Sequence, residues 1–317
     1  MAVDVLGMGA VAMDLVLRCE DLPGEDGFAF VREEAWLPGG SCSNVLVTLT
    51  SMGVPCAVSA QIGDDPYGDG VRADLDRAGV STQYLFTKRG GTSLHTLVAV
   101  DSRGSRSIFA NLGDAFLGLS ESQVDVEMLE GVKVFYTDMF AAKPALKLAM
   151  LCREMGIPTV FNLEVSPTFM ESCKVGREEL EEMMSLCHLL CVGREGLRGL
   201  TPAPHEKEAA LYLNEKYAPE GGVIVTLGGK GAFWAGKGET ISIPAFMVPA
   251  VDTTGAGDAF AGGFIYARLL RQRDMGRSLA FASACGAIKC QQPGPRFKAN
   301  EKEVEEFMEG RGNEHAQ

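Results

Sequence analysis

The sequence lacks the patterns that mark membrane-spanning, secreted and metal-binding proteins. No apolar run approaches the length of a membrane-spanning helix. Residues 1–17 are apolar, but they have no basic start and are interrupted by Asp4 and Asp14, so we expect no secretory signal. The nine cysteines are odd in number and scattered without any Cys-x-x-Cys pair, which argues against a disulfide framework or a zinc site. These absences favour a protein of the reducing cytoplasm.

Basic residues are also few. The chain has 29 lysines and arginines against 42 aspartates and glutamates, which gives a formal net charge of −13 at pH 7. This field would repel a phosphate backbone or an anionic membrane, so we expect neither nucleic acid nor membrane as a partner. A small phosphorylated ligand could still bind where backbone dipoles and Mg²⁺ outweigh the field locally.

The chain does have the composition of a large globular domain. It contains 317 residues, of which 46% are hydrophobic and 22% charged. From residue 132 onward, strand-like and helix-like segments alternate, which predicts a parallel sheet covered by helices. Ligands of such sheets gather at the carboxyl ends of the strands. Asp138, Asn162 and Glu164 follow predicted strand ends and are candidates for this reason, although each could equally cap a helix.

The segment 249–264 has the strongest functional pattern, PAVDTTGAGDAFAGGF. The small residues after the glycines favour a helix, whose unpaired N–H groups and dipole would bind an anion. Glycine also lets a phosphate approach the backbone. An aspartate in this place, Asp258, would repel an anion, so it makes sense as a catalytic base. The alternative is a first-turn carboxylate that only stabilises the helix.

Two other glycine-rich segments lie earlier in the chain. Residues 39–44 (GGSCSN) would make a tight turn against a ligand before a helix that stops at Gly53, and Asn44 would either contact the ligand or cap the helix. Residues 7–12 (GMGAVA) fit the loose dinucleotide fingerprint, which would make the chain an oxidoreductase. That fingerprint requires a helix directly after it, whereas residues 14–18 alternate like an extended segment. The oxidoreductase hypothesis therefore ranks behind.

Residues 252–258 (DTTGAGD) resemble the signature of the ribokinase-like (PfkB) family of carbohydrate kinases, and residues 39–44 resemble the family's first signature. The resemblance extends over nearly the whole chain. It implies an α/β fold, the ribokinase-like three-layer α/β/α arrangement with a mostly parallel central sheet and a small β-strand lid. We expect a single kinase domain over residues 1–312 and a disordered tail over 313–317. The lid strands are expected at about 14–19, 28–36, 92–100 and 105–110.

The resemblance also implies an activity. An ATP-dependent sugar kinase would transfer the γ-phosphoryl group of MgATP to a primary hydroxymethyl group, with Asp258 as general base. Backbone amides would form the anion hole, those of Gly255, Ala256 and Gly257. The residues expected to bind the sugar are Asp14, Gly39, Gly40, Asn44, Asp138 and Asp258.

Other positions of the family imply how the nucleotide and the ions bind. The expected ATP ligands are Thr226, Gly228, Gly229, Gly231, Gly257 and Ser283. Glu195 would take part in the network of Mg²⁺ and phosphate. A monovalent cation, K⁺, would lie among Asp252, Thr254, Lys289, Gln292 and Gly294. The lid is expected to join two copies of the chain in a homodimer.

Three positions depart from the family pattern. Ribokinases carry an asparagine where this chain has Ala12, the usual asparagine of the nucleotide site is Val192, and Lys298 stands where the cation loop usually has a small residue. Ala12 in place of the ribokinase asparagine makes ribose a weaker candidate for the acceptor. The acceptor stays open among ribose, fructose, 2-keto-3-deoxygluconate and a nucleoside. A second hypothesis is a catalytically silent regulator on the same fold that binds sugar or nucleotide.

Overall fold

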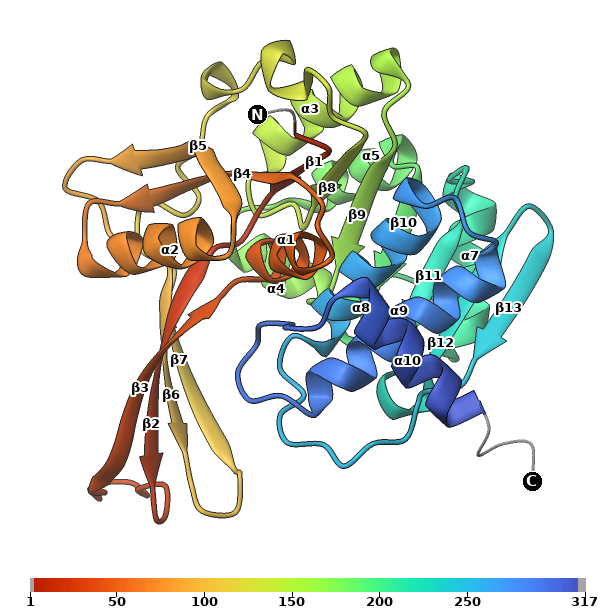
Figure 1. Ribbon diagram of the computed structural model, residues 1–317. Helices are drawn as coiled ribbons and strands as arrows, with labels where there is room; N and C mark the ends of the chain where they lie inside the picture. The colour runs from red at the N-terminus through yellow and green to blue at the C-terminus, as the bar shows by residue number, and fades with distance from the viewer. Residues whose placement is uncertain (1–2, 313–317) are drawn as a thin grey trace.

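The computed structural model describes residues 3–312, which form two sheets (Figure 1). The large sheet has the strand order β13-β12-β11-β10-β9-β8-β1-β4-β5, and the small sheet has the order β3-β2-β6-β7. From β11 along this order to β5, all neighbouring strands of the large sheet pair parallel, whereas β12 pairs antiparallel with both β11 and β13 at one edge. This arrangement confirms the expected α/β architecture with a mostly parallel central sheet and a small β-strand lid.

The elements have the following bounds. The large sheet contains β1 (Val5–Met8), β4 (Cys56–Gly63), β5 (Val80–Lys88), β8 (Val134–Thr137), β9 (Thr159–Leu163), β10 (Leu189–Val192), β11 (Val223–Thr226), β12 (Ala232–Gly236) and β13 (Glu239–Ile243). The small sheet contains β2 (Ala12–Cys19), β3 (Val31–Gly39), β6 (His95–Val100) and β7 (Arg106–Asn111). The helices are α1 (Ser41–Ser51), α2 (Pro66–Arg77), α3 (Ala142–Met155), α4 (Pro167–Ser172), α5 (Arg177–Leu186), α6 (Arg194–Leu197), α7 (Glu206–Tyr217), α8 (Ala256–Phe264), α9 (Met275–Cys290) and α10 (Glu301–Gly312).

Alternate residues of the central strands pack on opposite faces of the large sheet. In β8, Val134 and Tyr136 join the apolar cluster formed with α1, α8 and α9, whereas Phe135 joins the cluster formed with α3 and α5. In β9, Val160 and Phe161 divide in the same way. Because successive side chains of a strand point to opposite faces, a strand buried on both faces reads as a continuous apolar run. The sheet is therefore the middle of three layers.

The small sheet projects from the body of the molecule (Figure 1). Its strands lie close to the ranges that the sequence suggests, with one clear shift. The strand expected at 28–36 lies at Val31–Gly39, because its last residue, Gly39, pairs with Ala12 and the chain then enters α1 directly. β2 pairs antiparallel with β3 but parallel with β6. The lid sheet is thus mixed, and it is joined to the body beside the start of α1.

Residues 7–12 do not form a dinucleotide loop. β1 ends at Met8 and β2 begins at Ala12, so a strand follows the glycines where the fingerprint requires a helix. A Cβ on Gly9 would collide with the carboxylate of Asp138. This glycine therefore allows close packing around an aspartate, and the oxidoreductase hypothesis loses its only support.

Two expectations about the whole chain remain. Within residues 3–312, no helix combines the length and the apolar character needed to cross a membrane. The tail expected at 313–317 lies outside the described residues.

Candidate active site

The two signature segments meet where the first turns of α1 and α8 lie side by side (Figure 1). Gly255 precedes α8 with φ +79°, and a Cβ there would collide with the carbonyl oxygen of Pro295. Gly40 precedes α1 with φ +92°, and a Cβ there would collide with the carbonyl oxygen of Ala10. Both positions combine a left-handed conformation with close backbone contact, so both require glycine. Two helix N-termini therefore converge on one site.

Asp258 lies at the centre of this site. It is 5% exposed. Its Oδ1 accepts a hydrogen bond from Ser41 Oγ at 2.7 Å, and its Oδ2 accepts one from Asn44 Nδ2 at 2.7 Å. Burial raises the pKa of Asp258, and these two hydrogen bonds and the charge of Arg296 oppose the rise. A carboxylate with a raised pKa, fixed in one direction at a helix N-terminus, has the properties of a general base.

A line of polar side chains connects this carboxylate to the ends of β8 and β9. The hydroxyl of Tyr136 lies 3.4 Å from Ser41 Oγ and accepts a hydrogen bond from Asn162 Nδ2 at 3.1 Å. Asn162 also donates to Oε1 of Glu164 at 3.3 Å. The sequence placed Asn162 and Glu164 after a strand end, but Asn162 lies within β9 and only Glu164 follows the strand; both join the site. Ser41 and Tyr136 were not predicted, although Ser41 lies inside a signature segment.

Glu164 lies against Gly257, one of the residues expected to form the anion hole. A Cβ on Gly257 would be only 2.5 Å from Glu164 Oε1, so glycine at this position leaves room for the carboxylate beside the first turn of α8. Burial, and after it the negative charge of Asp258, raise the pKa of Glu164. The site therefore holds two carboxylates close enough to disfavour each other's charge.

Glu195 occupies a different environment from the one expected. Its side chain is 55% exposed and pairs with Arg198 at 3.1 Å on the short helix α6. The carboxylate against Gly257 is that of Glu164 instead. The resemblance to the family suggested Glu195, but the end of β9 is the strand end that reaches the first turn of α8.

Asp138 follows β8 and is 4% exposed. Its carboxylate accepts hydrogen bonds from the backbone N–H groups of Ala10 at 2.9 Å and Phe140 at 3.3 Å. Burial raises the pKa of Asp138 to about 7, against the effect of these hydrogen bonds. The backbone contacts fix the direction of the carboxylate, and its contact with a sugar remains a prediction.

Asp14 lies at the base of the lid. Thr96 Oγ1 donates to its Oδ1 at 2.6 Å, and a Cβ on Gly39 would be 2.5 Å from its Oδ2. Burial raises the pKa of Asp14, while the charge of Arg296 lowers it. The charge of the buried Arg296 thus lowers the pKa of both Asp14 and Asp258, which lie far apart in the sequence. The lid and the body contribute to one site.

Arg296 is a central residue of the site that the sequence analysis missed. It is 9% exposed, and it donates to Asn44 Oδ1 at 2.8 Å and to Asp74 Oδ2 at 2.6 Å. Because Arg296 holds the amide oxygen of Asn44, the amide nitrogen of Asn44 is directed to Asp258. No local signal marked it, because its partners Asn44 and Asp74 lie 252 and 222 residues away along the chain.

The residues expected to bind ATP lie at the end of β11 and in the turn after it. Thr226 ends the strand, and Gly228–Lys230 form a 3₁₀ turn in which Gly228 has φ +57°. A Cβ on Gly228 or Gly229 would meet no atom within 4 Å, so the turn presents open backbone to a phosphate. The carbonyl oxygen of Leu227, the residue after Thr226, accepts a hydrogen bond from Arg194 at 2.6 Å. The sequence did not predict this contact.

The last two expected ATP ligands have structural roles in the described chain. Gly231 closes the turn after β11 with φ +96°, and a Cβ there would collide with the carbonyl oxygen of Ile243. Ser283 lies on α9, is 8% exposed and donates to the carbonyl oxygen of Pro244 at 3.4 Å. Their contacts with a nucleotide remain predictions.

The five residues expected around a monovalent cation lie together, but a lysine ammonium occupies the position between them. Lys289 Nζ donates to the carbonyl oxygens of Asp252 at 2.9 Å and Gln292 at 3.2 Å. The carboxylate of Asp252 accepts hydrogen bonds from the N–H groups of Thr254 at 2.9 Å and Gly294 at 3.0 Å. This donor set does not fit K⁺, because carbonyl oxygens that the ion would need already bind a positive charge.

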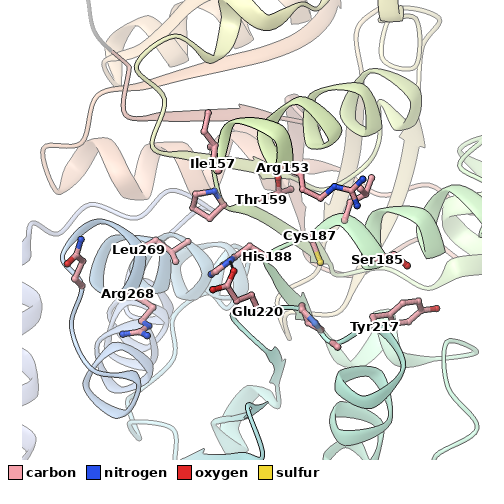
Figure 2. A pocket seen from close by; sticks show the side chains of 16 residues that line it. Arg153, Ile157, Thr159, Ser185, Cys187, His188, Tyr217, Glu220, Arg268 and Leu269 are labelled. Carbon is pink, nitrogen blue, oxygen red and sulfur yellow. Dashed lines mark ion pairs between the residues drawn. The ribbon is translucent and has the colours of Figure 1, made fainter.

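A cavity of about 810 Å³ lies away from this site, at the amino ends of the parallel strands (Figure 2). Thr159, the first residue of β9, lines it together with His188, which directly precedes β10. His188 Nδ1 lies 3.6 Å from a carboxylate oxygen of Glu220, and Arg268 lies nearby in the same wall. Asp258 is not among the lining residues, so this cavity is separate from the site described above.

The fold and the site define a class of protein. A mostly parallel α/β sheet, a buried aspartate in the first turn of a helix and a glycine-rich turn with open backbone are the parts expected of an enzyme that transfers phosphoryl groups. The comparison with known families makes the class specific. Residues 4–303 match the pfkB family of carbohydrate kinases, and the chain belongs to this family.

Individual relatives agree with this assignment. The chain is 28% identical to the ATP-dependent ribose-1-phosphate kinase of Halopiger xanaduensis, over 98% of this chain and 99% of that protein. Among solved structures, an Agrobacterium tumefaciens protein provisionally assigned as a ribokinase superposes with a TM-score of 0.88 at 23% identity, over 99% of each chain. An E. coli protein provisionally assigned as ribokinase II, solved with ATP and Mg²⁺, superposes with a TM-score of 0.82 at 23% identity, over 97% of this chain and 99% of that chain.

Proposed function

We propose that this chain is an ATP-dependent sugar kinase that transfers the γ-phosphoryl group of MgATP to a primary hydroxymethyl group. The observation that carries the proposal is the buried carboxylate of Asp258, fixed by Ser41 and Asn44 in the first turn of α8. Two relatives support it. One is named as an ATP-dependent ribose-1-phosphate kinase, and the other shares the fold and was solved with ATP and Mg²⁺.

Asp258 would take the proton of the acceptor hydroxyl as its oxygen attacks the γ-phosphorus. The acceptor hydroxyl would replace Ser41 as a donor to the carboxylate. Ser41 can give up this hydrogen bond because its hydroxyl also lies 3.4 Å from that of Tyr136. The amides of residues 255–257 would stabilise the charge on the transferring phosphoryl group, as donors fixed before the reaction begins. The chemistry requires little beyond this positioning and charge stabilisation.

The residues present fit a magnesium ion. Mg²⁺ in kinases keeps several waters and binds through one or two carboxylates together with substrate phosphates. Glu164, whose carboxylate fills the space left by Gly257, supplies such a carboxylate. Across residues 3–312, no group of three or more His, Cys, Asp and Glu side chains is arranged to hold a metal. When bound, Mg²⁺ would neutralise phosphate charge. We assign to Glu164 the place in the network of Mg²⁺ and phosphate that was expected for Glu195.

This assignment makes a paired prediction. Glu164→Gln is expected to lower kcat about 10- to 100-fold and to raise the Mg²⁺ concentration needed for half-maximal activity, because an oriented carboxylate is lost. Glu195→Gln removes the same charge from an exposed position and is expected to leave both quantities essentially unchanged. A magnesium titration of both variants at saturating ATP measures this. The reverse order of effects would return the role to Glu195.

A substrate panel identifies which compound accepts the phosphoryl group. We would measure ADP release from MgATP across pentoses, hexoses, keto-deoxy acids, nucleosides and ribose 1-phosphate. Strong stimulation by one of them is the expected result, and it would identify the acceptor together with the activity. If none stimulates turnover while ATP and a sugar still bind by calorimetry, the proposal fails and the chain is a binding protein on this fold.

We also propose that the lid joins two copies of the chain. The lid sheet and its loop between β2 and β3 carry large apolar side chains that face solvent, Phe28 at 83%, Phe30 at 75% and Phe109 at 67% exposure. β7 is exposed along its whole length. Large apolar surface of this kind marks an interaction site, and an uncovered edge strand invites pairing.

Phe109→Lys is accordingly expected to convert a dimer into a monomer, because it places a charge within the proposed interface. Sedimentation velocity at micromolar protein concentration measures the change. The control is Val126→Lys, which adds the same charge at a 50% exposed apolar position outside the lid. A wild-type protein that is monomeric at these concentrations contradicts the proposal.

A further inference from the structure

Lys289 is a buried cation whose ammonium group binds only backbone oxygens among the contacts described. It lies in the last turn of α9 and is 0% exposed. Its Nζ donates to the carbonyl oxygens of Asp252 and Gln292 at 2.9 and 3.2 Å. A buried lysine normally requires a carboxylate partner or a pKa low enough to lose its charge. In this structure two carbonyl oxygens accept the hydrogen bonds of the ammonium group instead.

The carbonyl oxygens that Lys289 binds belong to the two loops that border the anion hole. Asp252 lies three residues before Gly255, and its carboxylate accepts a hydrogen bond from Gly294 N at 3.0 Å. The next residue along that second loop, Pro295, packs its carbonyl oxygen directly against Gly255. The chain from Asp252 to Gly255 is therefore held from the side of α9, and Lys289 is the charged group at the centre of this contact.

The carboxylate of Asp252 partly offsets the burial of the Lys289 charge. Burial lowers the pKa of Lys289, and the negative charge of Asp252 opposes this. In turn, the charge of Lys289 helps to lower the pKa of Asp252. A second cation bound to the same carbonyl oxygens would lie within a few ångströms of the ammonium group, where like charges repel strongly.

We propose that Lys289 is a built-in replacement for a monovalent metal ion and that it positions the 252–255 loop, so that the enzyme works without K⁺. The catalytic part of this proposal depends on the kinase activity proposed above, whereas the structural part does not. Lys289 does not touch the reacting atoms and acts as a positioning residue. The ammonium group takes the place of the ion. Because it is covalently attached through its side chain, it occupies this position at any salt concentration.

The test compares three proteins in KCl and in choline chloride at equal ionic strength. They are wild type, Lys289→Ala, which removes the ammonium group and leaves space, and Lys302→Ala, which removes the same charge from an exposed position on α10. The readouts are the unfolding midpoint of the ligand-free protein, and kcat and KM for ATP. Because the unfolding midpoint needs no substrate, it reports on the cation site even if the chain is not a kinase.

Wild type and Lys302→Ala are expected to show the same midpoint and the same kcat in both salts. Lys289→Ala is expected to lose about 10- to 100-fold in kcat in choline, with a smaller change in KM, because the anion hole is displaced. K⁺ at about 0.1 M is expected to raise its midpoint by several degrees and to restore much of kcat, as a ligand that binds only the folded state does. Lys302→Ala should show neither effect.

Several results would overturn the proposal. The first is a wild-type protein whose midpoint or kcat rises strongly with K⁺, a result that needs no variant and therefore stands even if Lys289→Ala fails to fold. The second is a folded Lys289→Ala protein that keeps full activity in choline. The third is a folded and inactive variant that K⁺ neither stabilises nor reactivates, since the lysine would then serve only packing.

Discussion

Replacing Asp258 with asparagine is expected to lower kcat by about 10²–10⁴-fold, the usual contribution of a general base. The substitution keeps the shape of the side chain. Its oxygen can still accept from Asn44, and its new amide group can donate to the Ser41 hydroxyl, which is able to rotate and accept. The fold of the site should therefore survive while the proton acceptor is lost. Single-turnover kinetics with MgATP and the acceptor found in the substrate panel measure the effect.

Two further measurements separate a lost base from a damaged site. Calorimetry should show ATP affinity close to that of wild type. The unfolding midpoint at neutral pH should be no lower than that of wild type. The reason is that burial raises the pKa of Asp258 above its ordinary value of 3.8, so the ionised carboxylate costs stability as the pH rises above that value. Asparagine does not titrate and removes this cost.

The control for this experiment is Asp76→Asn, the same change at an exposed position on α2. It should leave kcat unchanged. Substantial turnover by Asp258→Asn, or a collapse of its ATP affinity, would contradict the assignment of Asp258 as the base.

Replacing Gly255 with alanine is expected to lower kcat about 100-fold or more, because it disturbs the donors of the anion hole. The backbone at this position has φ +79°, and a Cβ would also collide with the carbonyl oxygen of Pro295. That carbonyl belongs to the loop fixed through Asp252 and Lys289, so it cannot move without displacing the start of α8. We expect KM for ATP to rise as well, since the same amides bind the phosphate before transfer.

Gly131→Ala separates backbone strain from the collision. Gly131 has nearly the same conformation, φ +77°, but a Cβ there would meet no atom within 4 Å. Its replacement should cost about 1–3 kcal/mol of stability, the price of a left-handed alanine, and leave kcat unchanged. Thermal unfolding and steady-state kinetics of both variants provide the comparison. If Gly255→Ala behaves like Gly131→Ala, the anion hole does not depend on close packing against Pro295.

The sequence alone determined the class of fold and the centre of the site. Alternating strand and helix patterns after residue 132 predicted a covered parallel sheet, because burial on both faces leaves a continuous apolar run. The segments 39–44 and 252–258 predicted the two helix N-termini, because a left-handed turn against backbone requires glycine. These are local requirements of the backbone, and a local requirement can be read from neighbouring residues.

Only the tertiary structure decided which distant side chains complete the site. Glu164, and not Glu195, reaches Gly257, because the end of β9 meets the first turn of α8. Arg296 fixes Asn44 although 252 residues separate them, and Lys289 fills the position expected for K⁺. Each of these contacts joins elements that are remote in the sequence. Spacing along a chain fixes the direction of a side chain within its own helix or strand, but the partner it meets depends on how the layers pack.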